Sequence, residues 1–414
     1  KETIMAITIN QNPKTYSPAY NEINFLVTST NVAQANFLYV CDVYITGVTP
    51  TYFRLKAAQD PTSNKAVFDI HRIIENYLTT NIDKSTYGFQ RNTSSWVEYT
   101  CKFGEEYGLS SSGTTVYADL TVASAKYAFN GLWDFLEFTL YNDANYLLTS
   151  SSSLFLTSLK SKRVRSTMHS WAHFMANAAN KTNVMKIVAT STTGGVTTTV
   201  VDNAFPSPAT VTNDRFMRVS TGPANLNLIS SGTISFGAQP IIPTDTASYT
   251  IKIQTGALGT VTTETLTYTI DDACTKNDVL IFHWLNKYGG FDSFAFIRAN
   301  TQKADITRAN YKKPTGTISG STYSYSAADN QNTVFDTRIK DKIEVLSDWL
   351  TDAESVWLEE LVTSPEIYLD DATYGLVAVN VVDKAYEKKK AVSYKAFNLK
   401  LTFEYSYIRN RQRG

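Results

Sequence analysis

The sequence predicts a mainly β protein: two antiparallel β-sandwich domains, then a small α+β domain in which one helix packs on an antiparallel sheet. Three observations predict this. Apolar and polar residues alternate over many short segments, as they do in half-buried strands. The chain has 25 Tyr and 21 Phe but only 18% charged residues, a composition that favours pleated sheets. Helices and strands do not alternate as they would around a parallel sheet.

The length and the charge of the chain limit its organisation. Its 414 residues exceed the roughly 250–300 residues at which a single hydrophobic core stops growing. We therefore expect three domains, at residues 1–165, 166–290 and 291–414. Lys plus Arg and Asp plus Glu both total 38, so the formal net charge is zero. Such a chain has no overall field that attracts nucleic acid or anionic membranes, and little repulsion opposes its self-association.

The first expected domain, residues 1–165, is a sandwich that contains one helix. Apolar residues at 69–80 recur at the spacing i, i+3, i+4, i+7, i+8, which predicts an amphipathic helix with Asp69 as its N-cap. Strands are expected on either side of this helix. They are placed at 21–28, 37–45, 97–103, 132–141 and 154–159.

The second expected domain, residues 166–290, is another antiparallel sandwich. Two strand-like runs, 184–190 and 196–201, flank the letters STTGG, which signal a hairpin turn. Alternating residues at 249–253 and 266–270 predict two more strands across a turn that contains glycine. Short strands at this spacing are typical of a sandwich.

The third expected domain, residues 291–414, is the α+β module. Residues 312–326 are expected to form a loop or an exposed hairpin. A helix is expected at 352–362, and a basic tail ends the chain. The strands of this domain are placed at 366–369, 376–382 and 397–407.

The helix at 352–362 carries the strongest local signal. Thr351 and Glu354 form a capping box, in which each residue satisfies a free backbone amide of the first turn. Trp357 and Leu361 lie on one face and are expected to pack against the last sheet. Pro365 ends the helix.

The cysteines and the apolar segments suggest neither a metal site nor a membrane span. Cys41, Cys101 and Cys274 are widely spaced and form no Cys-x-x-Cys motif, so we expect them to act as small buried apolar residues. No segment reaches the 18 or so apolar residues of a spanning helix. The first residues also lack the apolar core of a secretory signal, so we expect folding in a cytoplasm.

The sequence offers little for catalysis. It has no GxSxG, Walker or dinucleotide-binding glycine motif. His169 and His173 form the one histidine pair at possible ligand spacing, but on a strand they would lie about 13 Å apart, and no third ligand is near. We therefore expect no catalytic residue, no cofactor and no metal.

Two basic clusters are candidate subunit-contact residues. One is Lys388, Lys389 and Lys390, with Lys384 nearby. The alternative interpretation of this cluster is a solvated hairpin loop between two strands. The other is Arg409, Arg411 and Arg413 in the tail, which could grip a neighbouring subunit. Either cluster could also lie free in solvent.

Several long stretches resemble one family of proteins. They are SPAYNEINFLV, VFDIHRIIENYL, LIFHWLNKYGGFDSFAF, DWLTDAESVWLEELVTSPEIYL and FNLKLTFEYSYIRNRQR, which occur in this order along most of the chain. Together they resemble virion structural proteins of tailed phages that infect Bacteroidetes, including the crAss-like phages.

The resemblance implies a non-enzymatic subunit of the virion neck or tail: a ring, hub or fibre-attachment protein assembled in the host cytoplasm. We then expect a homo-oligomeric ring of roughly six or twelve copies, joined to portal, neck, tail or fibre proteins. It would touch no membrane, and would touch nucleic acid only if it lined the tail channel. The alternatives are a tail-fibre protein that binds a receptor or glycan, and a tail-associated depolymerase.

Overall fold

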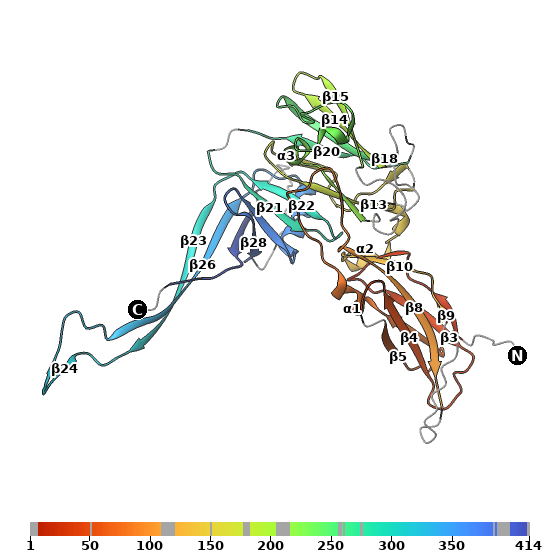
Figure 1. Ribbon diagram of the computed structural model, residues 1–414, viewed down its shortest axis with the longest axis horizontal. Helices are drawn as coiled ribbons and strands as arrows, with labels where there is room; N and C mark the ends of the chain where they lie inside the picture. The colour runs from red at the N-terminus through yellow and green to blue at the C-terminus, as the bar shows by residue number, and fades with distance from the viewer. Residues whose placement is uncertain are drawn as a thin grey trace. The chain divides into compact units, whose positions relative to one another are not determined.

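The computed structural model describes residues 7–49, 52–108, 121–149, 151–176, 183–203, 216–255, 259, 261–273, 276–383, 386 and 398–411. The expected fold class is confirmed, because the described chain is mainly β, with several antiparallel sheets and few helices (Figure 1). Residue contacts divide the chain into two compact units. The first unit comprises Lys1–Asp272 and Leu285–Asp292, and the second comprises Ala273–Trp284 and Ser293–Gly414.

This division differs from the three expected domains, because residues 1–165 and most of 166–290 fall in the first unit. One reason is a sheet that both regions build. In it, β7 (Phe89–Arg91) pairs with β16 (Phe216–Ser220), which also pairs with β13 (Trp171–Met175). Backbone hydrogen bonds therefore join the two regions, whereas independent domains meet at boundaries that few contacts cross.

Two sheets near the start of the first unit face each other across a hydrophobic core. One has the strand order β1-β3-β6, and the other has the order β2-β10-β8-β4-β5, with β9 beside β8. Phe25 and Phe68 of the first sheet contact Phe103 of the second, with ring centroids 5.1 and 5.9 Å apart. The strands are β1 (Ile7–Gln11), β3 (Asn24–Ser29), β6 (Lys65–Asp69), β2 (Tyr16–Pro18), β10 (Lys126–Phe129), β8 (Trp96–Glu106), β4 (Leu38–Ile45), β5 (Phe53–Ala57) and β9 (Thr121–Val122).

Cys41 and Cys101 are buried in this core as free thiols, as expected of small apolar residues. They come from the neighbouring strands β4 and β8. A hydrogen bond with Cys101 and burial raise the pKa of the Cys41 thiol far above its ordinary value, so Cys41 stays protonated. Cys274 lies outside the described residues.

A larger sheet follows, in the order β11-β19-β18-β14-β15-β17, with β12 and β20 attached. The expected hairpin is β14–β15, and Gly194 in its turn has a φ of +89°, which favours glycine. Not all neighbours are antiparallel: β12 runs parallel to β20, and β11 to β19. The strands are β11 (Ser151–Ser153), β19 (Thr262–Thr263), β18 (Thr246–Thr255), β14 (Asn183–Ser191), β15 (Val196–Asp202), β17 (Ile234–Phe236), β12 (Ser161–Val164) and β20 (Leu266–Ile270).

The helix expected at 69–80 is much shorter in the structure. It consists of α1 (His71–Ile74) and the 3-10 turn η1 (Glu75–Tyr77), and its N-cap is Ile70. Asp69 is instead the last residue of β6, and its carboxylate accepts hydrogen bonds from the backbone amides of Ile23 and His71. The expected N-cap therefore links two chain segments and does not cap a long helix.

Two of the expected strands are wrong. Residues 132–141 contain the helix α2 (Phe135–Thr139). Their buried and exposed apolar residues do not alternate as in a strand: Trp133 is buried, whereas the neighbours Phe135 and Leu136 are both exposed. Residues 154–159 follow β11 as irregular chain, yet Phe155 and Leu156 are buried. The other short helices among the described residues are η2 (Asp143–Asn145), α3 (Pro223–Leu226) and η4 (Ser231–Thr233). Among the described residues, no helix is long and apolar enough to cross a membrane.

The second unit is built on one sheet, in the order β22-β21-β27-β28-β29-β26-β23. β30 pairs with β26, and β24–β25 form a separate hairpin at the expected exposed segment 312–326. The strands are β22 (Phe291–Phe296), β21 (Leu280–Leu285), β27 (Ile367–Asp371), β28 (Gly375–Val381), β29 (Lys400–Tyr405), β26 (Asn332–Leu346), β23 (Thr301–Lys312), β30 (Arg409–Asn410), β24 (Thr317–Ser319) and β25 (Thr322–Ser324).

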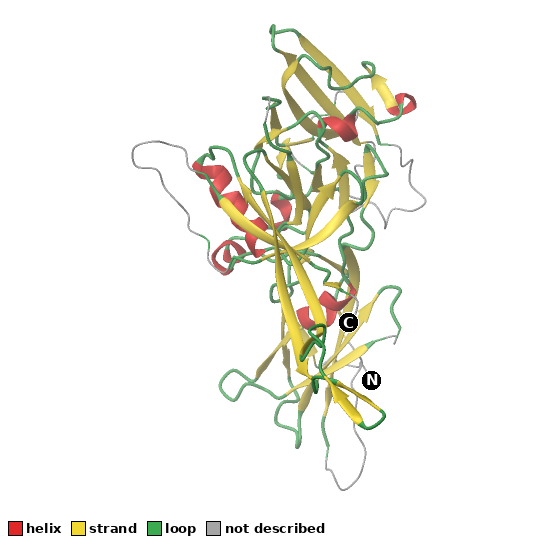
Figure 2. Cartoon of the chain, turned by 90° about the vertical axis from the view of Figure 1, so that its left-hand side faces the viewer, coloured by secondary structure: helices red, strands yellow, loops and turns green. Residues whose placement is uncertain are grey.

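The helix α4 (Asp352–Thr363) lies against this sheet, and it is the longest helix in Figure 2. Its capping box is present: the Thr351 hydroxyl accepts from the Glu354 amide, and the Glu354 carboxylate accepts from the Thr351 amide. Trp357 and Leu361 are buried. The Trp357 ring lies 4.8 Å from that of Trp284 on β21, so aromatic packing fixes the helix on the sheet.

We predict that Trp357→Ala destabilises the second unit by roughly 3–5 kcal/mol, because it removes a fully packed aromatic side chain and leaves a cavity. Trp349→Ala is the matched control, since Trp349 is 57% exposed and should cost far less. Urea denaturation followed by circular dichroism measures both changes. Equal effects of the two substitutions would contradict the packing of α4 described here.

Candidate interaction surface

The sheet of the second unit extends into a long two-stranded ribbon, which ends in the β24–β25 hairpin (Figure 1). β23 pairs with β26 along its whole length, and all 12 residues of β23 are exposed. Since β23 is the outermost strand of the sheet, no strand of the described chain pairs with its outer edge. We call residues 301–342 the arm.

One face of the arm is covered by ion pairs. Side chains at alternate positions of β23 and β26 project to this face, where each charge meets one of opposite sign on the same or the neighbouring strand. The hydrogen bond with Lys342 keeps the pKa of Asp305 below its ordinary value and that of Lys342 above it. The pairs are Lys303–Glu344 at 2.6 Å, Asp305–Lys342 at 2.5 Å and Asp336–Arg338 at 3.0 Å.

The opposite face of the arm carries apolar side chains beside polar and charged ones. Ile306 lies across from Ile339, and Val334 lies across from Asn310, so these side chains share a face. Ile306 is 48% exposed and Val334 is 37% exposed. The arm therefore presents one face of internally paired charges and another on which the exposed side chains of Ile306 and Val334 lie among the cations Arg308 and Lys312.

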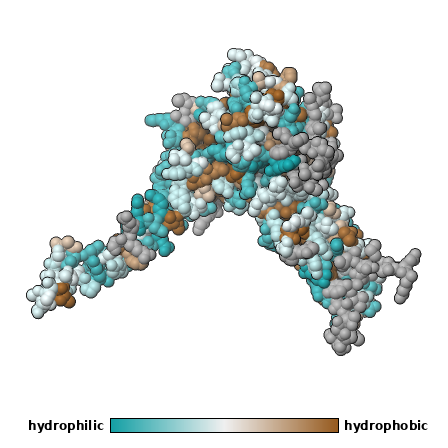
Figure 3. All heavy atoms as spheres, in the orientation of Figure 1, coloured by the Kyte–Doolittle hydropathy of each residue, from teal (hydrophilic) through white to brown (hydrophobic). Residues whose placement is uncertain are grey.

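Aromatic and apolar side chains also gather toward the end of the arm. Ile318 and Tyr325 are each 74% exposed and Tyr323 is 47% exposed. The rings of Tyr323 and Tyr325 meet edge to face at 5.1 Å. In Figure 3 a few brown, apolar spots lie on the otherwise hydrophilic surface of the ribbon.

Three cations of the arm form no ion pair with any residue that the structure describes. They are Arg308, Lys312 and Lys313, and all three are exposed. The carboxylates in β23 and β26, in contrast, all take part in ion pairs. Asp329, between β25 and β26, offsets one of these charges, so the outer half of the arm has a net charge of +2 beside its exposed apolar side chains.

The basic tail residues lie beside the arm. Arg409, on β30, contacts the Asp341 carboxylate through two nitrogens at 2.5 and 2.6 Å, which raises the pKa of Arg409 further. The Arg411 backbone amide donates to Thr337 at 3.1 Å, and its side chain is exposed. The remaining candidate contact residues, Lys388, Lys389, Lys390 and Arg413, lie outside the described residues, as does Lys384.

The first unit contains a buried ion pair that the sequence did not predict. Lys162 Nζ lies 2.5 Å from Asp292 Oδ1, and their side chains are 2% and 1% exposed. Thr157 and Asn286 also donate hydrogen bonds to the Asp292 carboxylate. The charges are thus paired and hydrogen-bonded, as buried charges must be.

A tight turn places Asp292 in this cluster. Asn286 Oδ1 accepts from the amides of Tyr288 and Gly290, each at 3.0 Å. Gly289 has a φ of +80°, and a Cβ there would lie 1.6 Å from the Asn130 carbonyl oxygen. A Cβ on Gly290 would meet the His173 ring at 2.5 Å. The stretch NKYGGFDSF thus needs its two glycines for close packing.

His173 lies beside this cluster on β13, directly across from Arg218 on β16. It is buried, and its Nε2 atom has no hydrogen-bond partner among the described residues. Burial, with a further contribution from the Arg218 charge, lowers the pKa of His173 to about 3. His173 is therefore neutral at physiological pH.

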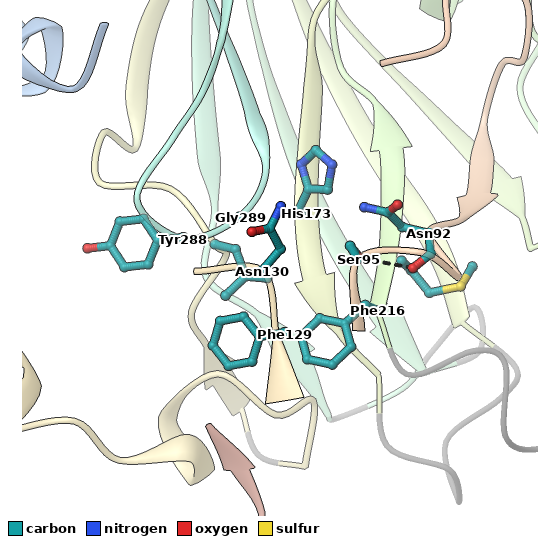
Figure 4. Close-up of a pocket in the computed structure, with 10 residues that line it drawn as sticks. Asn92, Ser95, Phe129, Asn130, His173, Phe216, Tyr288 and Gly289 are labelled. Carbon is teal, nitrogen blue, oxygen red and sulfur yellow. Dashed lines mark hydrogen bonds between the residues drawn. The ribbon is translucent and has the colours of Figure 1, made fainter. Parts of the chain in front are cut away.

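A small cavity of about 10 Å³ lies next to His173 (Figure 4). The rings of Phe129 and Phe216 lie 5.0 Å apart at its wall, and Asn130 and Gly289 line it too. This volume is near the lower limit for holding one water molecule, so a substrate does not fit. The cluster therefore looks structural.

The structure places the two histidines of the sequence pair, His169 and His173, in different surroundings. His173 lies within β13, whereas His169 precedes that strand and stacks on Trp171. In the described parts of the chain, no group of three His, Cys, Asp or Glu side chains is placed to hold a metal ion. No protein-family model matches the chain, and a comparison with curated proteins finds none similar to it.

We predict that Lys162→Met destabilises the first unit by roughly 3–5 kcal/mol, because it leaves the Asp292 carboxylate buried without its counter-charge. Adding Asp292→Asn should recover much of this loss. The control is Lys303→Met in an exposed ion pair, which should cost less than about 1 kcal/mol. Chemical denaturation compares the variants, and a loss at Lys162 no larger than at Lys303 would contradict the buried pair.

We also predict a pH dependence that comes from His173. Its pKa is about 3 in the folded protein and has an ordinary value of 6.5, so only the unfolded state gains a proton between these values. This stability is complete above pH 6.5 and is lost as the pH falls toward 3, by up to about 1.4 kcal/mol per pH unit. In urea denaturation between pH 7 and pH 5, the free energy of unfolding should fall less with pH for His173→Gln than for the unmodified protein.

Proposed function

We propose that this chain is a non-enzymatic structural subunit of a bacteriophage virion, in a neck or tail ring or in the tail hub that joins portal, tail and fibres. The observation that carries the proposal is the arm. A two-stranded ribbon with both faces in water is only marginally stable by itself. Contact with another protein would stabilise such a ribbon, which suits a subunit of a larger assembly.

The surface chemistry of the arm supports the same function. Its outer edge is an unpaired strand of 12 exposed residues, and proteins usually shorten, charge or cover such edges. Exposed Ile and Tyr side chains near its end suit the apolar centre of a protein interface. The resemblance of the long stretches to phage virion proteins supplies the type of assembly, and the neutral net charge permits close packing of copies.

A second candidate is a tail-fibre protein that binds a receptor or glycan. The exposed pair Tyr323–Tyr325 favours it, since aromatic rings in water can stack on sugar faces. The exposed side chains of Ile306 and Val334 favour the subunit proposal, because they suit a protein partner better than a polar glycan.

We predict that the purified protein forms a closed homo-oligomer, of roughly six or twelve copies, in native mass spectrometry. A truncated variant that joins Thr307 to Arg338, which are paired in the ribbon, by an Asn-Gly turn should lose the oligomer. Its circular dichroism should remain that of a folded β protein. A protein that stays monomeric at high concentration, or binds glycans through Tyr323 and Tyr325, would favour the receptor-binding alternative.

A further inference from the structure

The short helix α2 in the first unit holds large apolar side chains in solvent. Leu132 is 54% exposed, Phe135 78%, Leu136 76% and Leu140 84%. Scattered exposed apolar residues are normal, but a group of this kind within one helix and its flanks is typical of a contact site. We call these four residues the α2 patch.

The α2 patch is held firmly from its other side. Trp133 is buried, and its backbone N–H and carbonyl both bond the Asn21 side chain, at 2.8 and 2.9 Å. The Tyr141 hydroxyl donates to the Tyr16 carbonyl at 2.8 Å. The exposed side chains are therefore presented on a fixed backbone, which lowers the entropy cost of binding.

Acidic side chains border the α2 patch. Asp134 and Glu137 are 83% and 46% exposed. Lys287 contacts the Glu137 carboxylate at 2.6 Å and lies 3.9 Å from Asp134. Two carboxylates and one ammonium group leave this border with a net charge of −1. The α2 patch is thus apolar and anionic, whereas the outer arm, with Arg308, Lys312 and Lys313, is apolar and cationic.

We propose that the outer arm of one copy of this chain docks on the α2 patch of a second copy; the proposal rests on the subunit function above. The two surfaces match in both respects that decide an interface: exposed apolar side chains at the centre and opposite charge around them. Both surfaces belong to the same chain, so every copy supplies one of each. No other protein is needed to pair them.

A contact of this kind is head-to-tail. Each copy uses its arm on one neighbour and offers its α2 patch to another, which produces a closed ring if the rotation between copies closes. In such a ring, the outer arm and the α2 patch of every copy are both covered by a neighbouring copy. The contact also predicts that adding salt weakens assembly, because exposed charges contribute to it.

Two variants test the contact by complementation. The arm variant is Ile318→Asp with Tyr325→Asp, and the patch variant is Leu136→Asp with Leu140→Asp; all four residues are strongly exposed, so both variants should fold. Each alone is expected to be monomeric. An equal mixture is expected to form a heterodimer and nothing larger, because only the patch variant has a working arm and only the arm variant has a working patch.

The control is Val67→Asp with Val122→Asp, two residues of the first unit that are each 57% exposed and lie outside the patch. It should assemble like the unmodified protein in analytical ultracentrifugation. Oligomers that survive both the arm and the patch substitutions would overturn this contact while leaving the subunit function standing. The same holds if the two monomeric variants fail to pair, or if only the patch variant loses assembly. An unmodified protein that never self-associates would overturn both proposals.

Discussion

Strand β26 is the element on which the arm depends. At its inner end Ile343 and Val345 are 2% and 1% exposed, and the strand pairs with both β23 and β29. At its outer end, beyond the short pairing with β30, it pairs with β23 alone. The buried end fixes the register of the strand, because a slip of one residue would expose the buried side chains. Since the strand is continuous, the same register holds in its outer part. The core thus determines which side chains the arm presents on each face.

The buried polar cluster favours one arrangement of the segments that form it. Lys162 and Asp292 are removed from water and satisfied by neighbouring side chains, and the cavity next to His173 holds at most about one water molecule. Buried pairs of this kind contribute little net stability but make a single arrangement much better than its alternatives when all partners are present. The turn at 286–290 and strand β12, which carries Lys162, are held together in this way within the first unit.

The sequence predicted what is local or periodic and missed what depends on distant partners. The capping box of Thr351 and Glu354 was predictable because both residues lie within one helical turn. Alternation likewise predicted the core strands. Segment 132–141 was assigned to a strand because its apolar residues do not reveal which of them stay in water. The Lys162–Asp292 pair joins residues 130 positions apart, and no local pattern signals such a pair. The exposed hairpin within 312–326 was anticipated, but the long strands β23 and β26 were missed because most of their arm residues are exposed, so only weak alternation marks them.

A β-bulge in the arm determines the face on which Val334 lies. Ala309 lies opposite Asp336, but the next residue, Asn310, lies opposite Val334, so Phe335 is the extra residue of β26. A bulge of one residue reverses the alternation beyond it. Without it Val334 would share the face of Asp336 and the ion pairs. With it Val334 lies on the face of Ile306, where the cations Arg308 and Lys312 also project, so this side of the outer arm combines apolar and positively charged groups.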